Sequence, residues 1–266
     1  MLNKNASKSQ RFDVPTYTTK TYIEKKFDYA LVIPILNEEG RISEQLEKIK
    51  ILSPNVDIIL ADGGSTDGSI LDSKMKYANV STLLEIKSEG QLSAQLRMAF
   101  HYCLLSGYLG VITMDGNNKD GTLGIIEILS KLEQGFDFVQ GSRFIKNGQS
   151  VNTPPIRYIA IRFFHAPLIS LGAKHWYTDT TNGFRGHSRN LLESQAISIF
   201  REVFKKYELL SYIPIAASKQ GFKVTEVGVK REYPKNVPTP TKIKGVKNHL
   251  SVARVLFKAI LGDYDK

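Results

Sequence analysis

The tripeptide Asp115-Gly116-Asn117 carries the side chains of this sequence best suited to chemistry on a charged ligand. It directly follows an apolar run, residues 109–114, of the kind that forms a buried parallel strand. Ligands of open α/β sheets bind just beyond the carboxyl ends of such strands. A carboxylate and an amide placed there suit a hard divalent cation that carries a diphosphate. By itself, the tripeptide is equally explained as an Asx turn.

Two other polar turns follow predicted strands in the same way. Asn37-Glu38 comes after the apolar residues 29–36, which include Pro34, and Asp62-Gly63-Gly64 comes after residues 56–61. Each turn alone is explained by a strand exit, a helix N-cap or a Gly-rich βα connection. Because the carboxyl ends of parallel strands lie at one edge of a sheet, the three turns together predict one crevice.

The spacing of apolar residues alternates between strand and helix patterns along the first half of the chain. This alternation predicts right-handed βαβ units and a parallel sheet with helices on both faces. The predicted strands are residues 29–36, 56–61, 80–86, 109–114 and 136–140. Ile42, Leu46 and Ile49 are spaced for one face of a first helix, and further helices are predicted at 69–77, 91–105 and 122–132. In the second half we predict helices at 154–171, 204–219 and 250–261, strands at 184–187 and 222–231, and a mobile basic loop at 234–247.

The composition narrows the classes of partner. The chain has 266 residues, 42% of them hydrophobic, and a net charge of +10, which favours anionic partners such as nucleotides or phospholipid surfaces. Nucleic acid is disfavoured because the basic residues are dispersed, without interleaved aromatic residues. Cys103 is the only cysteine, so no disulfide framework is expected. We expect neither a signal peptide nor a membrane-spanning helix, since no apolar run is long enough.

Five motifs in order resemble those of the glycosyltransferase family 2 enzymes. They are Pro34-x-x-Asn37-Glu38, Asp62-Gly-Gly-Ser-Thr-Asp67-Gly, Asp115-Gly-Asn117, Gly141-Ser142-Arg143-Phe144 and Asp179-Thr180-Thr181-Asn182-Gly183-Phe184-Arg185. The last two resemble the polyprenyl-phosphate branch, of the dolichol-phosphate mannose synthase type. The resemblance implies an α/β nucleotide-diphospho-sugar transferase (GT-A type) fold, with a mostly parallel central sheet flanked by helices. We therefore expect a polar extension at 1–27, one glycosyltransferase domain at 28–245 and an amphipathic helix at 246–266.

The resemblance also implies roles for individual residues. Those implied to bind the donor are Pro34, Asn37, Glu38, Asp62, Gly64, Arg97, Asp115, Gly116, Asn117, Arg231 and Lys242. Asp115 and Asn117 would hold Mg²⁺ or Mn²⁺ on the donor diphosphate. Arg143, Arg157 and Arg185 would bind the acceptor, and Asp115, Arg143 and Asp179 would serve catalysis.

Elementary chemistry supports some of these roles. Negative charge develops on the leaving diphosphate, so Arg, Lys or a metal must stabilise it. A phosphate acceptor needs an Arg fork but no strong base, because its oxygen is already anionic. Asp179 would then order its own loop, whereas a hydroxyl acceptor would need Asp179 as a general base.

The metal site departs from the pattern of the family. Close relatives usually have a second acid where this chain has Asn117, and often an oxygen ligand where it has Lys119. An amide oxygen can bind a hard cation but brings no charge, and an ammonium cannot bind one. We therefore expect weaker metal dependence, with Lys119 and Arg231 supplying part of the missing charge.

Our sequence-based hypothesis is an inverting transfer of a sugar from a UDP- or GDP-linked donor to a polyprenyl-phosphate-type lipid. We expect a cytoplasmic protein, peripheral on the membrane face if the acceptor is a lipid. The alternatives are transfer to a saccharide hydroxyl for a cell-surface polysaccharide and a non-catalytic nucleotide-sugar-binding protein. A nucleotidyltransferase is disfavoured, because Glu38 and Glu39 stand where that class has a Gly-rich basic loop.

Two features leave a membrane role open. Tyr158, Phe163, Phe164 and Trp176 suit a lipid groove, although core packing is the more frequent use of such aromatic residues. The amphipathic stretch 250–261 suits either an interfacial helix or a helix docked on the domain.

Overall fold

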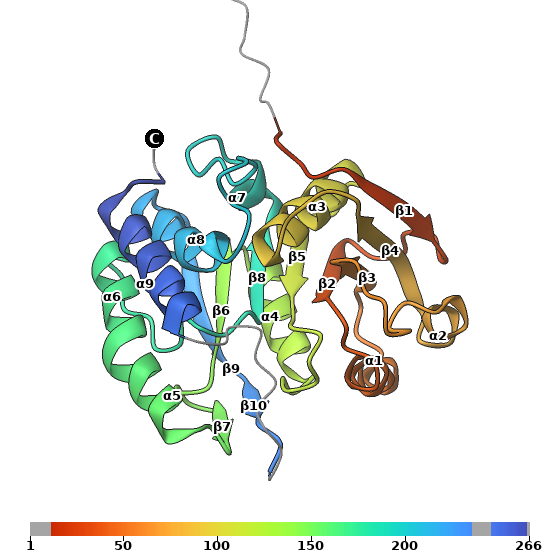
Figure 1. Cartoon of the computed structure of the whole chain (residues 1–266), viewed down its shortest axis with the longest axis horizontal. Helices are drawn as coiled ribbons and strands as arrows, with labels where there is room; N and C mark the ends of the chain where they lie inside the picture. The colour runs from red at the N-terminus through yellow and green to blue at the C-terminus, as the bar shows by residue number, and fades with distance from the viewer. Residues whose placement is uncertain (1–11, 236–245, 265–266) are drawn as a thin grey trace, which may run out of the picture.

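The computed structural model describes residues 12–235 and 246–264. In this part of the chain, one sheet of eight strands in the order β1-β4-β3-β2-β5-β8-β6-β9 runs through the molecule between two layers of helices (Figure 1). The strands are β1 (Tyr17–Thr21), β2 (Tyr29–Ile35), β3 (Asp57–Asp62), β4 (Val80–Ile86), β5 (Gly110–Thr113), β6 (Phe138–Ser142), β8 (Arg185–Ser188) and β9 (Val224–Gly228). The expected α/β sheet flanked by helices is thus confirmed.

The helices of the first half follow the predicted pattern closely. They are α1 (Arg41–Leu52), α2 (Asp72–Tyr77), α3 (Leu92–Leu105) and α4 (Gly124–Glu133). The second half adds α5 (Pro155–Ile159), the π-helical turn η1 (Ala160–His165), α6 (Ala166–Ala173), α7 (Arg189–Glu193), α8 (Glu208–Lys219) and α9 (Val246–Leu261). The segments α5, η1 and α6 follow one another without a break, as the predicted helix at 154–171 requires.

Alternation along the strands divides the core into two halves. In β2, Leu31 and Ile33 point into the core beneath α1, α2 and α4, while Ala30 and Val32 point into the core beneath α3 and α8. All four side chains are fully buried. The near-continuous apolar sequence of β2 therefore reflects burial on both faces of the sheet.

The N-terminal segment does more than extend the chain. Strand β1 pairs antiparallel with β4 and forms one edge of the sheet. Its sequence, YTTKT, is largely exposed, so it lacks the apolar alternation by which strands are recognised. The polar segment expected at 1–27 thus includes an edge strand.

The C-terminal part also differs from the expectation in detail. The strand predicted at 222–231 is two strands, β9 and β10 (Lys230–Glu232), and β10 pairs with β7 (Gln149–Val151) in a separate parallel sheet. Helix α9 packs on α6 and α8, with Leu256 and Ala259 buried, so this helix is docked on the domain. Most of the predicted basic loop at 234–247, including Lys242, lies outside the described residues.

The directions of β5, β8 and β9 bring three connecting segments to one edge of the sheet. Strand β8 is antiparallel to β5 and β6, so its first residue, Arg185, lies opposite Thr113 at the end of β5. Strand β9 is parallel to β6 and ends at Gly228, opposite Ser142. The loop before β8 and the segment after β9 therefore meet the loop after β5 at one edge of the sheet.

Candidate functional site

The first two motifs meet, as their positions after neighbouring strands predict. The side-chain oxygen of Asn37 accepts a hydrogen bond from the amide of Thr66 at 2.8 Å, and the amide of Asn37 donates to Ser65 Oγ at 2.9 Å. Asn37 adopts a left-handed backbone conformation with φ of 51°, which asparagine tolerates better than most residues. The β2–α1 loop and the β3–α2 loop thus form one continuous surface.

Two acids of these loops shape the backbone. Asp62 is 1% exposed, and its carboxylate accepts hydrogen bonds from the amides of Gly64 (2.9 Å) and Ser65 (3.0 Å). Glu38 is nearly buried and receives Arg41 Nε at 2.6 Å. Both carboxylates stabilise turns, which is the simpler of the two roles that the sequence allowed for them.

Asp115 lies at the end of β5, packed closely by two glycines. A Cβ at Gly116 would come within 2.6 Å of Ile35 and 3.1 Å of the carbonyl of Pro34. A Cβ at Gly183 would come within 2.6 Å of Asp115 Oδ1. Gly116 therefore lets the backbone approach β2 closely, and a side chain at Gly183 would displace the Asp115 carboxylate.

Arg231 links this strand end to β10. Its Nη2 lies 2.9 Å from Asp115 Oδ2, and its Nη1 lies 2.6 Å from Asp120 Oδ2 and 3.2 Å from Asn182 Oδ1. The arginine is 6% exposed, and the neighbouring carboxylates raise its pKa further despite its burial. Sequence reasoning predicted Arg231 here but missed Asp120, whose only signal was its position five residues after Asp115.

Burial shifts the pKa values of Asp120 and Lys119, which lie next to Arg231. Removal from water raises the pKa of Asp120 to about 6, although Arg231 acts in the opposite direction. Burial and the charge of Arg231 lower the pKa of Lys119, whose ammonium lies 5.2 Å from the centre of the Tyr233 ring. A cleft of about 1080 Å³ opens beside them, lined among others by Asn117, Lys119 and Asp120.

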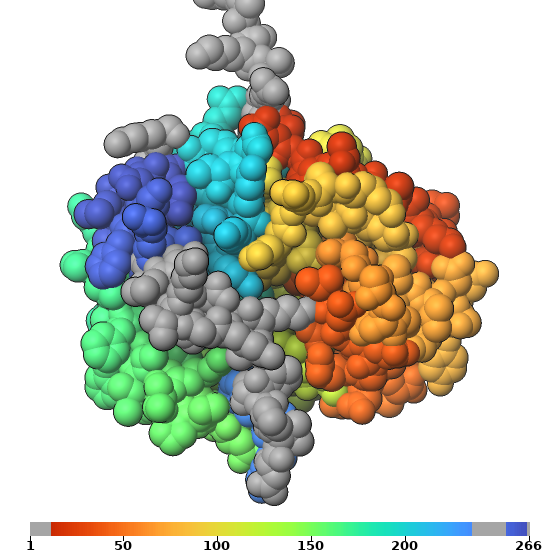
Figure 2. All heavy atoms as spheres, viewed as in Figure 1, coloured from red at the N-terminus to blue at the C-terminus, as the bar shows by residue number. Residues whose placement is uncertain are grey.

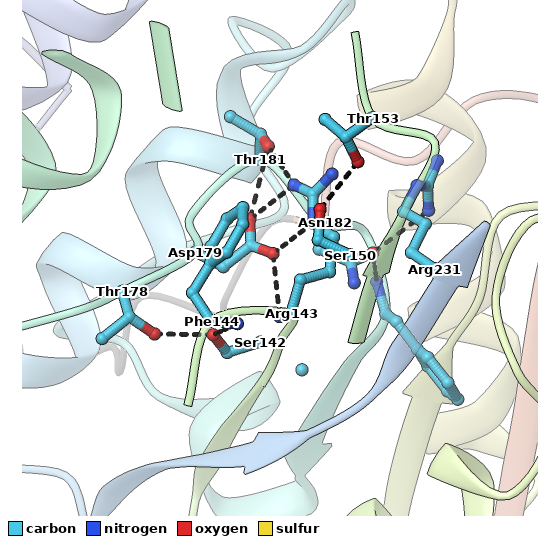
Figure 3. Close-up of polar contacts among 12 residues, drawn as sticks. Ser142, Arg143, Phe144, Ser150, Thr153, Thr178, Asp179, Thr181, Asn182 and Arg231 are labelled. Atoms are coloured by element: carbon cyan, nitrogen blue, oxygen red, sulfur yellow. Dashed lines mark hydrogen bonds and ion pairs between the residues drawn. The ribbon is translucent and has the colours of Figure 1, made fainter. Parts of the chain in front are cut away.

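Arg143 and Asp179 form a buried ion pair with two contacts (Figure 3). Arg143 Nε lies 2.6 Å from Asp179 Oδ2, and Nη2 lies 2.8 Å from Oδ1 and 2.9 Å from Thr181 Oγ1. Their side chains are 1% and 0% exposed. Such geometry holds the loop before β8 against the end of β6. It leaves no exposed carboxylate at Asp179.

Tyr233 is a further member of the site that sequence reasoning missed. Its hydroxyl lies 3.4 Å from Arg143 Nη1 and 3.3 Å from Arg157 Nη1. The ring is 2% exposed, and the nearby cations Arg231, Arg157 and Arg143 lower the pKa of its phenol against the effect of burial. The position directly after β10 was its only sequence signal.

Two of the predicted arginines, Arg97 and Arg185, donate hydrogen bonds to backbone carbonyls. Arg97 is 3% exposed and donates to the carbonyls of Phe204, at 3.0 Å, and Asp13. Arg185 is 2% exposed and donates to the carbonyls of Asn182 (3.0 Å), Leu210 and Thr180 (both 2.8 Å). These bonds give Arg97 and Arg185 structural roles, and their expected donor and acceptor contacts stay predictions.

The oxygens near Asp115 offer a limited set of cation ligands. Asn117 Oδ1 is buried without a hydrogen-bond partner among the described residues, and Asn117 Nδ2 lies 3.5 Å from Asp115 Oδ2. Where the structure describes the chain, no group of three His, Cys, Asp or Glu side chains could hold a metal ion. One carboxylate and one unpaired amide oxygen therefore fit a cation that takes its remaining ligands from a diphosphate.

Residues 30–206 match the model of Glycosyl transferase family 2. The chain belongs to this family. It is accordingly a glycosyltransferase, and the family and enzyme class expected from the five motifs are confirmed.

The chain is also similar, at low identity, to two proteins named for mannose transfer. The chain is 25% identical over 205 residues to polyprenol monophosphomannose synthase of Mycolicibacterium smegmatis, covering 75% of each protein. It is 24% identical over 201 residues to undecaprenyl-phosphate mannosyltransferase of Micrococcus luteus, covering 74% of this chain and 81% of that protein.

A solved structure supports the fold. The glucosyl-3-phosphoglycerate synthase of Mycobacterium tuberculosis, in complex with Mn²⁺, UDP and phosphoglyceric acid, superposes with a TM-score of 0.60. At 16% identity the match covers 88% of this chain and 77% of that one. This family 2 domain therefore has the GT-A type fold that the motifs predicted.

Proposed function

We propose that this glycosyltransferase moves a sugar from a UDP- or GDP-linked donor to a polyprenyl-phosphate-type lipid, with inversion at the anomeric carbon. The observation that carries the proposal is the placement of Arg231 against Asp115 at the carboxyl edge of the sheet, next to Tyr233 and its two arginines. In this proposal, Arg231 and Asp115 would serve the donor diphosphate, and the neighbouring arginines at Tyr233 would serve the acceptor phosphate. The two mannosyltransferase relatives, named for polyprenol and undecaprenyl phosphate, support the acceptor class.

On the donor side, the leaving group would be a nucleoside diphosphate. Arg231 is held in place by Asp115 and Asp120, and in this proposal it would face the negative charge that develops on the leaving diphosphate. Lys119, which lies between Asp115 and Asp120 in the loop after β5, adds a second positive charge. Charges fixed before the reaction stabilise a transition state better than mobile ones, because they need no reorganisation.

A divalent cation would be held by Asp115 and Asn117. It would supply Lewis-acid stabilisation of the diphosphate, as Mn²⁺ bound with UDP suggests for the Mycobacterium tuberculosis enzyme. Because Arg231 already occupies one oxygen of Asp115, the protein offers such a cation little negative charge. This supports a weaker dependence on metal than a site with two acids would have.

On the acceptor side, Arg157 is the best candidate to bind a phosphate. Its guanidinium is half-buried and contacts the Tyr233 hydroxyl, whereas Arg143 spends two of its three nitrogens on Asp179. The burial of Asp179 in this pair disfavours it as a general base. An acceptor that is already anionic needs no base, which favours a phosphate over a saccharide hydroxyl.

The deciding experiment is a panel of donors and acceptors. The protein is incubated with UDP- or GDP-linked sugars, a short polyprenyl phosphate, and either Mn²⁺ or EDTA, and released nucleoside diphosphate is measured. We expect release that requires the polyprenyl phosphate and a glycolipid product of inverted configuration. Turnover only with saccharide hydroxyls, abolished by Asp179→Asn in a folded variant, would instead support the polysaccharide alternative. Binding of donors without any turnover would contradict the proposal.

A further inference from the structure

The helical segment α5–η1–α6 exposes an unusual series of large apolar side chains. Along it, Ile156, Ile159, Phe163 and Leu171 are 84%, 49%, 66% and 73% exposed. Phe164 is 62% exposed beside them. Because 156, 159 and 163 are three or four positions apart, they lie along one side of the helix. Exposed apolar patches of this kind mark surfaces that contact another apolar phase.

The charge of the same segment has a single sign. Residues 154–178 contain no Asp or Glu but include Arg157, Arg162 and Lys174. Lys174 is exposed at the end of α6, and Trp176, 67% exposed, follows it. Tryptophan beside basic residues is typical of the boundary between a membrane and water, and basic residues attract anionic lipid head groups.

The segment also begins at the proposed acceptor site. Arg157 of α5 contacts the hydroxyl of Tyr233, while its neighbour Ile156 is the most exposed of the apolar side chains. One turn of helix therefore joins the phosphate-binding end of the site to the apolar surface. In Figure 1 this helical segment lies along the margin of the molecule, away from the first half of the sheet, and Figure 2 shows its atoms on the molecular surface.

We infer that the outer side of α5–η1–α6 is a docking surface for an anionic lipid bilayer, and that it holds the acceptor site against the membrane. The amphipathic C-terminal helix is a poorer candidate, because Leu256, Ala259 and Tyr264 of that region are buried against the domain. No helix of the described residues is long and apolar enough to cross a membrane. Contact through this surface would be made by side chains that enter the head-group region.

This inference rests on the proposed lipid-phosphate acceptor, but it is tested without donor or acceptor. The full chain is sedimented with vesicles of phosphatidylcholine, with and without phosphatidylglycerol. We expect binding to the vesicles that contain phosphatidylglycerol and a loss of about 100-fold or more in the double variant Phe163→Ser, Phe164→Ser, since each buried Phe contributes at least about one order of magnitude. Lys174→Gln should weaken binding to the anionic vesicles only.

A matched control is available on the other helices. Ile51 of α1 and Leu105 of α3 are 78% and 73% exposed, so the double variant Ile51→Ser, Leu105→Ser removes similar apolar surface. We expect this variant to bind vesicles like the unmodified chain, and circular dichroism should show both variants folded. Equal binding by the Phe163 and Phe164 variant, or no binding by the unmodified chain, would overturn the inference. So would a dimer of the unmodified chain that becomes a monomer in this variant, because the face would then bind a second copy.

Discussion

Arg231 Nη2 lies 2.9 Å from Asp115 Oδ2, although the two residues are 116 positions apart in the sequence. The contact joins the end of a central parallel strand to a short strand of a separate sheet. The same guanidinium also binds Asp120, so one cation serves two carboxylates. Asp115, which the sequence analysis expected to be catalytic, therefore has its negative charge partly balanced by Arg231 before any ligand binds.

This relationship predicts the effect of replacing Arg231. Lysine keeps the charge, but its single nitrogen cannot reproduce the separate contacts of Arg231 Nη2 with Asp115 and of Nη1 with Asp120. We expect Arg231→Lys to lower kcat for nucleoside diphosphate release by about 10²-fold, the usual cost of losing one oriented charge at a transition state. Lys230→Gln, which alters an exposed neighbour paired with Glu232, is the matched control and should have normal kcat. Unchanged kcat in Arg231→Lys would contradict this role.

Asp120 predicts a pH dependence. Burial raises its pKa to about 6, so it is neutral below that pH and its carboxylate holds Arg231 only above it. We expect kcat/KM to fall as the pH drops through about 6 and expect this acid limb to vanish in Asp120→Asn. An identical acid limb in the variant would assign the titration to another group.

The same shift has a consequence for stability with a definite sign. A carboxyl group whose pKa is raised by folding opposes folding once it is ionised, so its unfavourable contribution grows as the pH rises from about 4 to about 6. Asp120→Asn removes that contribution. The Tm of Asp120→Asn minus the Tm of the unmodified chain should therefore be more positive at pH 7 than at pH 4. Thermal unfolding of both proteins at the two pH values measures this difference.

Breaking the buried ion pair of Arg143 and Asp179 should lower the stability of the fold. Asp179→Asn would leave a buried guanidinium without its counter-charge, which costs about 3 kcal/mol or more. We expect a clearly lower Tm in thermal unfolding. Glu193→Gln, which removes the exposed partner of Arg189, should change the stability by less than about 1 kcal/mol. An unchanged Tm together with lost turnover in Asp179→Asn would instead indicate a general base.

Position 117 predicts the response to metal. Asn117→Asp adds the missing negative charge beside Asp115, so it should tighten Mn²⁺ binding and make turnover more sensitive to EDTA. In the unmodified chain we expect residual turnover in EDTA, which Lys119→Ala should reduce further. Titration calorimetry with Mn²⁺ measures the first effect, and nucleoside diphosphate release measures the second. Complete loss of turnover in EDTA, with Lys119→Ala unaffected, would refute the weak metal dependence.

Tyr233 predicts a change in acceptor affinity. Its hydroxyl contacts both Arg143 and Arg157, so Tyr233→Phe frees those guanidinium groups to move. We expect KM for the polyprenyl phosphate to rise about threefold to tenfold, with little change in KM for the donor. Tyr77→Phe, at an exposed tyrosine of α2, is the control. Equal effects on donor and acceptor would contradict a positioning role on the acceptor side.

Much of the fold could be predicted because its signals are local. The apolar runs that became β2 to β5 and the apolar spacing of α1, α3 and α4 each lie within a short window of sequence. Strand β1 was missed because an exposed edge strand needs no apolar alternation. The backbone contacts of Arg97 and Arg185 were not foreseen for another reason, since nothing local shows that a guanidinium will donate to backbone carbonyls.

By itself, the sequence determined which polar residues stand at the ends of the parallel strands, and so the family and the place of Asp115. Only the tertiary structure decided their partners. The antiparallel insertion of β8 sets Asp179 against Arg143, and the path from β9 to β10 sets Arg231 between Asp115 and Asp120 (Figure 3 shows the first of these contacts). Strand-end motifs follow from short-range patterns, whereas these charge pairs depend on strand order and direction, which bring together segments far apart in the chain.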